Sequence, residues 1–345
     1  MVEKLVITGG PCSGKTTGIA HIASRMALYG VRPYVVPESA TLSYLSTGRP
    51  AADDIWRYQA SLICLQMDLE NHFERIAEIN ALRDGMRPIL VCDRGVLDGK
   101  AFCPEGWWAA ACKEAGIDES RILASRYSGV VHLVTSAESA PWAYSLANNS
   151  VRVEDAAEAI VADHRLQLAW MGHPNGIKVI RGGGDFDEKI EEAANAAAAL
   201  AGLPASGGKR RRWRVSTDEG HQLLRSGSEV VKIKISEHYI GSTRVQKREA
   251  SGGYIATLSV RTQSWTTERI IGHEDFIAMT GTRKPDVEFE RCSCVIGNVH
   301  VEVDLLISPR VDYCLITSDA TEPPCGAVSM EPDAWYSTVV CGESQ

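Results

Sequence analysis

The chain has 345 residues, of which 44% are hydrophobic and 23% are charged, and this length and composition favour two globular domains. Its formal net charge of −8 is unevenly spread: residues 205–308 are net basic and the stretches on either side are net acidic, which favours an anionic ligand in the middle. No apolar run reaches the roughly 18 residues of a membrane span, no basic leader is present, and no C-x-x-C spacing occurs, so we expect a cytoplasmic protein with reduced thiols.

Residues 1–204 alternate short apolar runs with longer helical patterns. The apolar runs predict five strands, at residues 5–8, 33–37, 89–92, 130–134 and 177–180. Apolar residues at helical spacing predict helices at residues 15–29, 55–82, 154–170 and 186–201. Because strands that alternate with helices form parallel sheets covered on both faces, this half is predicted to be an α/β domain.

A short flexible linker is predicted at Ala205-Ser206-Gly207-Gly208, after a glycine and a proline that end the preceding helix. From residue 209 the apolar pattern changes to period two. It predicts strands at residues 231–235, 243–248, 254–261, 288–292 and 299–305, with a short helix at 273–281. We therefore expect an antiparallel β tunnel or barrel over residues 209–317, and the tail 318–345 is left unassigned.

A glycine-rich motif connects the first strand to the first helix. Residues 9–16 fit the pattern G-x-x-x-x-G-K-[ST] in the strand–helix context that this motif requires. Backbone N–H groups of such a loop point at phosphates, Lys15 reaches the β- and γ-phosphates, and the Thr16 hydroxyl ligates Mg²⁺. The motif predicts binding of ATP or GTP with Mg²⁺, and the predicted nucleotide-binding residues are Gly9, Gly10, Pro11, Cys12, Ser13, Gly14, Lys15, Thr16 and Thr17.

Four further residues are candidates for catalysis beside Lys15. Asp93 follows an apolar strand, where a carboxylate holds Mg²⁺ or its water, or else caps a helix. Glu38 ends another strand and is a candidate general base, or a surface turn residue. Arg94 is suited to a phosphate or acceptor contact, or to a salt bridge, and Arg152 to a lid that stabilises the transferring phosphoryl group, or to a solvated helix start.

Charged residues alternate with apolar residues along several strands of the second half. His300, Glu302 and Asp304 share one side of a predicted strand, and a sheet that curls with charges inward forms a polar tunnel. Bases for phosphates and acids for a cation suit a metal-bound polyphosphate, although a solvated face with paired charges is the alternative. The predicted anion-binding set is Lys232, Lys234, Arg244, Arg248, Arg261, Arg291, Glu302 and Asp304.

Several segments in order resemble one family. "ITGGPCSGKTT", "VPESA", "CDRGVLDGKAF", "NNSVRVE" and "GHP", within about residues 4–200, resemble the P-loop domain of ribosylnicotinamide kinases and of the TRPL-translocation-defect protein family. Residues 210–308 resemble a divergent triphosphate-tunnel domain of the CYTH type, and the order of the two halves is that of the TRPL-translocation-defect family. The resemblance implies a kinase-like P-loop fold that binds ATP or GTP, and a second domain that recognises phosphoinositides or polyphosphates.

The second half departs from the tunnel family at its start. That family opens with an E-x-E-x-K strand, whereas the matching place here, residues 209–215, reads KRRRWRV and contains no acid. Binding without hydrolysis is therefore more plausible than metal-dependent catalysis in the tunnel. The basic run around Trp213 also suits contact with an anionic membrane surface or nucleic acid, or a solvated linker end.

Three functions follow from these residues. The first is transfer of the γ-phosphate of ATP or GTP to a nucleoside or another small hydroxyl compound, with the tunnel domain binding a phosphorylated substrate or regulator. The alternative is a GTP-gated phosphoinositide-binding protein that makes peripheral membrane contact and transfers no phosphate. A weaker alternative is triphosphate hydrolysis in the tunnel. The guanine-reading N-K-x-D motif is absent, so the sequence does not separate ATP from GTP.

Overall fold

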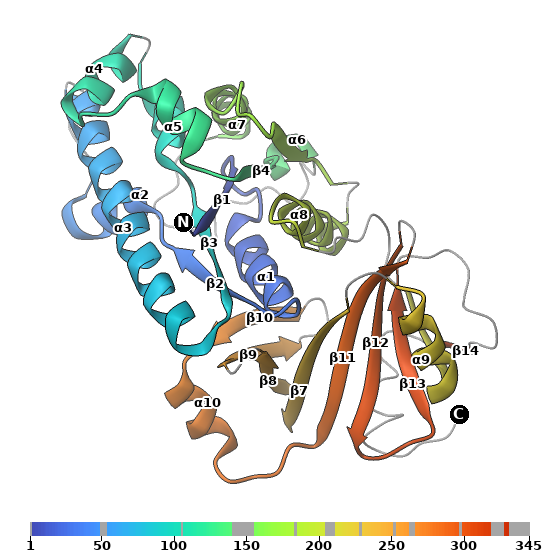
Figure 1. Cartoon of the computed structure of the whole chain (residues 1–345). Helices are drawn as coiled ribbons and strands as arrows, with labels where there is room; N and C mark the ends of the chain where they lie inside the picture. Colours follow the sequence, from blue (N-terminus) through green and yellow to red (C-terminus); the bar gives the residue numbers. More distant parts are fainter. Residues whose placement is uncertain are drawn as a thin grey trace. The chain divides into compact units, whose positions relative to one another are not determined.

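A computed structural model (Figure 1) describes residues 2–48, 54–104, 106–139, 155–182, 185–203, 211–227, 230–250, 253–261, 266–296, 299–318 and 328–330. The chain divides into two compact units, and the main division between them falls between Ala201 and Gly202. The predicted linker at residues 205–208 lies outside the described residues.

The first unit contains a five-stranded sheet in the order β2-β3-β1-β4-β5. β1 pairs in parallel with β3 and β4, and β4 pairs in parallel with β5, which confirms the predicted α/β fold. The chain leaves β1 toward one edge and β4 toward the other, so the carboxyl ends of β1 and β4 form the switch point where such sheets bind ligands. The strands are β1 (Glu3–Gly9), β2 (Val31–Val36), β3 (Arg87–Asp93), β4 (Gly129–Leu133) and β5 (Ile177–Ile180).

Helices flank this sheet, and Figure 1 shows α3 on one side and α1 with α8 on the other. Three of them start at carboxylate N-caps: Asp155 forms a capping box with Glu158, and Asp118 and Asp185 each accept two backbone N–H bonds. The described helices are α1 (Lys15–Ala27), α2 (Ser39–Thr47), α3 (Ile55–Asp84), the 3-10 helix η2 (Val96–Phe102), α4 (Trp107–Glu114), α5 (Glu119–Ser125), α6 (Ser136–Ser139), α7 (Ala156–Ala169) and α8 (Phe186–Leu200).

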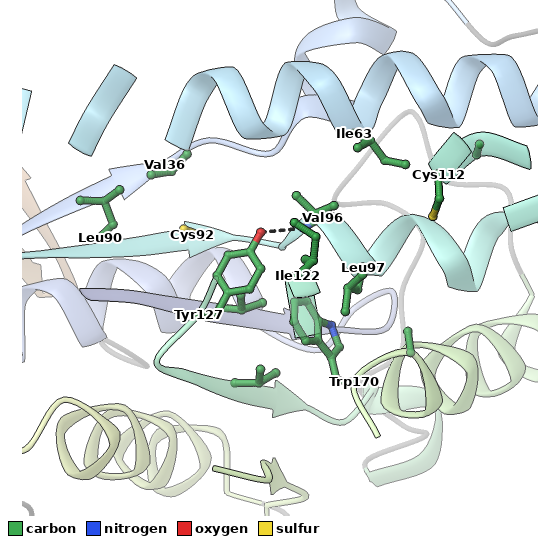
Figure 2. Packing of buried hydrophobic residues seen from close by; sticks show 14 of the residues in the cluster. Val36, Ile63, Leu90, Cys92, Val96, Leu97, Cys112, Ile122, Tyr127 and Trp170 are labelled. Carbon is green, nitrogen blue, oxygen red and sulfur yellow. Dashed lines mark hydrogen bonds between the residues drawn. The ribbon is translucent and has the colours of Figure 1, made fainter. Parts of the chain in front are cut away.

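Figure 2 shows the buried core on the α3 side of this sheet. Trp170, at the end of α7, is fully buried and meets the ring of Tyr127 edge to face at a centroid distance of 5.3 Å. The Tyr127 hydroxyl also accepts a hydrogen bond from the backbone N–H of Val96 at 2.9 Å. The segment that follows β3 is therefore anchored in the core by both packing and a buried hydrogen bond.

The second unit contains a nine-stranded sheet in the order β10-β9-β8-β7-β11-β12-β13-β6-β14. Its pairs are antiparallel, which confirms the predicted β-rich second half. The strands are β6 (Arg211–Ser216), β7 (Val231–Ile240), β8 (Thr243–Ala250), β9 (Gly253–Arg261), β10 (Thr266–Ile271), β11 (Val287–Ile296), β12 (Val299–Ser308), β13 (Tyr313–Ser318) and β14 (Val328–Met330).

Two helices, α9 (Thr217–Arg225) and α10 (His273–Thr280), cover one face of this antiparallel sheet. Leu223 and Leu224 of α9 pack on a cluster that contains Trp213, and Phe276 of α10 packs on a second cluster around Val245 and Leu258. Directly opposed residues of paired antiparallel strands share a face, and the register places both clusters on the same one. The opposite face carries an apolar cluster that includes Ile235 and Phe289, and beside it the polar side chains that are described below.

Candidate nucleotide site

The glycine-rich loop leaves β1 at the predicted place and closes on the first turn of α1. Gly14 has a φ of 85°, in the left-handed region that favours glycine, and Cys12 adopts a φ of 56°. A Cβ on Gly9 would lie 2.2 Å from the carbonyl oxygen of Leu133, so this position has no room for a side chain. Ser13 is buried, and its Oγ has no hydrogen-bond partner in the described part of the chain. A loop with a close backbone approach and an unused hydroxyl fits a phosphate ligand.

Lys15 begins α1, and its Nζ contacts Oδ1 of Asp93 at the end of β3. Ile7 of β1 lies beside Asp93 in the register, so the parallel pairing fixes this meeting. Asp93 is not the cap of the following helix, because the N-cap of η2 is Gly95. Thr16 is exposed in the first turn of α1. A carboxylate and a hydroxyl are hard oxygen donors, so these two residues fit the Mg²⁺ that nucleotides carry.

Glu38 and Arg94 form an ion pair next to Lys15. Nε of Arg94 donates to Oε1 of Glu38 at 2.7 Å, and the Thr41 hydroxyl donates to Oε2 at 2.7 Å. Burial opposes ionisation of Glu38, but the positive charges of Arg94 and Lys15 outweigh it and lower the pKa to about 2. The structure therefore brings the candidate residues Lys15, Glu38, Asp93 and Arg94 together at the carboxyl ends of β1, β2 and β3.

Asp98 holds the segment that carries Arg94. Its Oδ1 accepts from the hydroxyl of Thr8 at 2.9 Å and from the indole N–H of Trp170 at 2.7 Å, and its Oδ2 accepts from the N–H of Gly95 at 3.1 Å. Burial raises the pKa of this carboxyl, and the charge of Arg94 works against that rise. Arg94 has a φ of 67°, which is costly for a residue with a side chain, so the surrounding contacts must impose it.

A second buried network connects this segment to the one that carries Glu38. Gln66 of α3 accepts from the N–H of Ser39 at 3.1 Å and donates to Glu70 at 3.2 Å. Glu70 accepts from the Tyr127 hydroxyl at 2.8 Å, and Tyr127 in turn accepts from the N–H of Val96 (Figure 2). One chain of hydrogen bonds thus fixes both loops that carry candidate catalytic residues.

Asp163, in the middle of α7, is hydrogen-bonded to the backbone of the glycine-rich loop. Its side chain is fully buried, and its Oδ1 accepts from the N–H of Gly10 at 2.8 Å and from the N–H of Thr135 at 3.0 Å. A Cβ on Gly10 would lie 2.6 Å from the same oxygen, so this close approach requires glycine. The sequence contains a signal for this residue, because Asp163 is in phase with the buried face of α7 formed by Ala159, Leu166 and Ala169.

The remaining candidates of the first unit are only partly described. Pro11 lies in the loop and Thr17 in the first turn of α1, as expected. Arg152 and the predicted lid around it lie outside the described residues.

One face of the sheet in the second unit carries a set of polar side chains, here called the polar face: Arg212, Glu237, Arg244, Gln246, Arg248, Arg291, Glu302 and Asp304. Arg291 donates to both oxygens of Asp304, at 2.6 and 2.7 Å, and its Nη1 lies 3.3 Å from Oε2 of Glu302. Burial opposes the charge of Arg291, but the two carboxylates outweigh it and raise the pKa of the guanidinium. Burial lowers the pKa of Arg212, and Asp304 offsets part of that effect. The polar face therefore contains four arginines that three carboxylates largely balance.

Two of the predicted anion-binding residues lie elsewhere. Lys232 and Lys234 are on the face opposite to Arg244 and Arg291, and they are exposed in ion pairs with Glu290 at 3.0 Å and Glu288 at 3.3 Å. These lysines match the alternative of a solvated face with paired charges.

Three other expectations for the second unit concern single side chains. Arg261 ends β9 and His300 lies in β12, but their side chains are outside the described residues. Trp213 is 2% exposed within the core of the second unit, so it is not available to touch a membrane or a nucleic acid.

The parallel sheet, the loop after β1 and the lysine at the start of α1 define a P-loop nucleotide-binding unit. Residues 4–189, which are more than half of the chain, match the family model described as an AAA domain, and the chain belongs to this family. A search among curated proteins finds no match.

Two structure matches concern one other protein, under two descriptions. One is the hypothetical protein NE1496, with 17% identity and a TM-score of 0.28, and the other is the inorganic triphosphatase NE1496, with 16% identity and a TM-score of 0.26. Each match covers 39% of this chain and 97% of the other chain.

Two further features apply to the described residues alone. No helix among them is long and apolar enough to cross a membrane. Nor do three or more of their His, Cys, Asp or Glu side chains gather in a way that could hold a metal ion.

Proposed function

We propose that the P-loop unit binds ATP or GTP with Mg²⁺ and transfers the terminal phosphoryl group to a hydroxyl group of a small molecule, such as a nucleoside. The observation that carries this proposal is the arrangement of Lys15 with Asp93 and of Arg94 with Glu38 at one edge of the sheet. A purely binding P-loop needs the lysine and the metal ligand, but it does not need a second, partly buried acid–base pair beside them. Phosphoryl transfer uses such a pair to place the acceptor and to balance charge.

The low pKa of Glu38 restricts its role. A carboxylate with a pKa of about 2 is ionised at neutral pH but is a weak proton acceptor. Phosphoryl transfer has a loose transition state and asks for position more than for proton removal. Glu38 would therefore accept a hydrogen bond from the acceptor hydroxyl and orient it, and Arg94 would turn toward the phosphoryl oxygens when an acceptor takes its place on Glu38.

The test uses the purified full chain with γ-labelled ATP or GTP, Mg²⁺ and a panel of nucleosides and other hydroxyl compounds. Lys15→Ala should weaken triphosphate binding by about 100-fold, because the lysine that holds the phosphates is lost. Glu38→Gln should lower acceptor-dependent label transfer by roughly 100-fold while triphosphate affinity stays within about threefold.

Ser43→Ala is the matched control for the test at Glu38. Ser43 lies in α2, and its Oγ accepts from the Tyr58 hydroxyl at 2.9 Å, so the change removes a hydrogen bond near Glu38 without touching the ion pair. Its transfer rate should equal that of the wild type. If no acceptor in the panel receives label from a protein that still binds triphosphate, phosphotransfer is wrong and nucleotide-gated binding replaces it.

The polar face of the second unit favours a second function, recognition of a polyphosphate or a phosphoinositide headgroup. Arg244 is the least enclosed arginine of the set with a described pair: its Nη1 lies 3.6 Å from Glu237, and its side chain is 34% exposed. A partly exposed arginine can bind a phosphate at lower desolvation cost than Arg291, which is buried and holds Asp304 with two short hydrogen bonds.

Titration of the full chain with tripolyphosphate, and flotation on vesicles with and without phosphoinositide, test this second function. Arg244→Ala should weaken binding by about tenfold, because one charge-assisted contact is lost. Lys234→Ala removes a cation from the opposite face and should change nothing. Equal losses in both variants would mean that the effect is one of net charge and that the polar face is not the site.

The other proposals rest on fewer contacts. A GTP-gated phosphoinositide protein at a membrane needs nucleotide to change vesicle binding, so flotation with and without GTP decides it. Hydrolysis of triphosphate in the second unit needs a divalent cation on Glu302 or Asp304, both of which are engaged by Arg291. A cytoplasmic location fits the described cysteines, which are not joined in disulfides.

A further inference from the structure

Asp163 is a buried carboxylate to which the proposed chemistry gives no task. Charged side chains are rarely buried unless they are paired, and this one accepts from several donors. In addition to the N–H groups of Gly10 and Thr135, it accepts from the side chain of Gln167 at 2.9 Å and lies 2.9 Å from Nε2 of His132. Burial raises the pKa of Asp163, but these hydrogen bonds outweigh it and lower the pKa, so the group is ionised at neutral pH.

The surrounding groups explain why the charge is tolerated there. Nδ1 of His132 is buried and has no partner among the described residues, so the proton belongs on Nε2, where it is donated to Asp163. On α8, Lys189 donates from Nζ to the carbonyl oxygen of Val134 at 2.6 Å. Burial lowers the pKa of Lys189 to about 8, and Asp163 offsets part of that drop. A carboxylate with this many supports is held in one position.

Asp163 reaches three consecutive residues of the glycine-rich loop. It accepts from Gly10 directly, and it fixes Thr135, whose hydroxyl donates to the carbonyl oxygen of Pro11. The N–H of the adjacent Ser136 lies 3.4 Å from the carbonyl oxygen of Cys12. The first part of the loop is thus tied to the segment after β4 through one side chain of α7.

We propose that Asp163 is a positioning residue of the nucleotide site: by holding Gly10 and Thr135 it keeps residues 10–12 in the shape that binds phosphates. The inference rests on triphosphate binding by this loop. Geometry and charge act in opposite directions here, because a negative charge behind the loop repels phosphate while its hydrogen bonds shape the loop. Two substitutions separate the two effects.

The experiment measures the dissociation constants of Mg–ATP and Mg–GTP for the full chain, together with amide hydrogen exchange in the loop. Asp163→Ala should weaken binding about 10- to 100-fold and speed exchange of the Gly10 and Thr135 amides, because these two buried N–H groups lose their acceptor. Asp163→Asn keeps an oxygen for both N–H groups and removes the charge. Its amide N–H groups then face Gln167, whose side chain can flip to present its oxygen, and Nε2 of His132, which can accept once the ring proton moves to Nδ1. Its affinity should then match or slightly exceed that of the wild type. Gln167→Met is the control: it removes a donor to the same carboxylate without touching the loop, and affinity should stay within about threefold.

Several results would overturn the proposal. One is a folded Asp163→Ala protein that binds triphosphate as the wild type does while Lys15→Ala does not. Another is equal tightening in the Ala and Asn variants, which would show that only charge matters. If Lys15→Ala itself binds normally, nucleotide binding by the loop is wrong, and loop exchange alone then decides whether Asp163 shapes it. Should Asp163→Ala not fold, Gly10→Ala forces the loop off the carboxylate and must lose affinity in its place.

Discussion

Glu38 is charged at every pH at which the protein is expected to work, because Arg94 and Lys15 hold its pKa at about 2 against an ordinary value of 4.5. The side chain of Arg94 is 15% exposed and that of Glu38 is 20% exposed, so water screens the attraction between them only in part. A carboxyl whose pKa is lower in the folded state stabilises that state above its ordinary pKa. This stabilisation is lost as the pH falls through the folded value.

Replacement of Glu38 by Gln should therefore show a distinct pH dependence. At pH 7 the variant should lose about 1–3 kcal/mol of unfolding free energy, because Arg94 is left without its partner. The difference should shrink as the pH falls from about 4.5 toward about 2, since wild-type Glu38 then takes up a proton as well. Urea unfolding at several pH values measures both quantities.

Glu78→Gln, on an exposed part of α3, is the control for this prediction. It should change stability little, because this side chain is exposed. A difference between wild type and Glu38→Gln that stayed constant from pH 7 to pH 3 would mean that the ion pair with Arg94 does not form in solution.

At the scale of elements, the helix α3 and the strand ends act as one support. The chain of hydrogen bonds from Ser39 through Gln66, Glu70 and Tyr127 to Val96 ties the segment after β2 to the segment after β3. Burial raises the pKa of Glu70, and Arg126 opposes that rise from 2.7 Å. Each residue of this chain is a hydrogen-bond partner of the next, so removal of one side chain leaves a buried polar group without a partner.

Tyr127→Phe tests this support. The variant keeps the ring that packs on Trp170 but leaves the N–H of Val96 without its acceptor, which should cost about 1–3 kcal/mol of unfolding free energy. Because Val96 lies two residues after Arg94, the rate of phosphotransfer should fall more than triphosphate affinity does. A loss of stability with no change in rate would restrict the network to folding.

The same scale shows what the sequence alone could predict. The five strands of the first unit and its helices α1, α3, α7 and α8 follow from periodicity, and the P-loop follows from its motif. The shorter helices α2, α4, α5 and α6 do not, because each is too short to show a helical period. The helix α9 was missed although Ser216 and Glu219 form a capping box at its start, because its short apolar stretch is embedded in strand patterns. The sequence prediction groups Lys232 and Lys234 with Arg244 because alternation shows which residues of one strand share a face. It does not show which faces of two different strands coincide, since that depends on register and turns.

Over the whole molecule, the residues around the candidate site fall into two groups: those that a nearby sequence pattern indicates, and those that only the folded packing brings there. The residues of the loop and of the strand ends are close to the motif in sequence or follow apolar runs, so they could be named in advance. Asp163 and Gln66 act on the site from 153 and 27 residues away along the chain, and only the folded packing brings them there. Residues 205–308 do carry a net positive charge, as the sequence shows. On the polar face, however, carboxylates neutralise most of the charge of the arginines.

The contact between Lys15 and Asp93 has one further consequence. An ammonium group that already donates to a carboxylate has part of its charge and one of its three donors engaged, so arrival of a triphosphate is in part an exchange of one anion for another. The net binding free energy of the triphosphate is therefore smaller than the contact between Lys15 and the phosphate alone would give. A cation that binds the released carboxylate of Asp93 would recover the lost part. Metal and nucleotide should then each tighten the binding of the other by the same factor, as thermodynamic linkage requires.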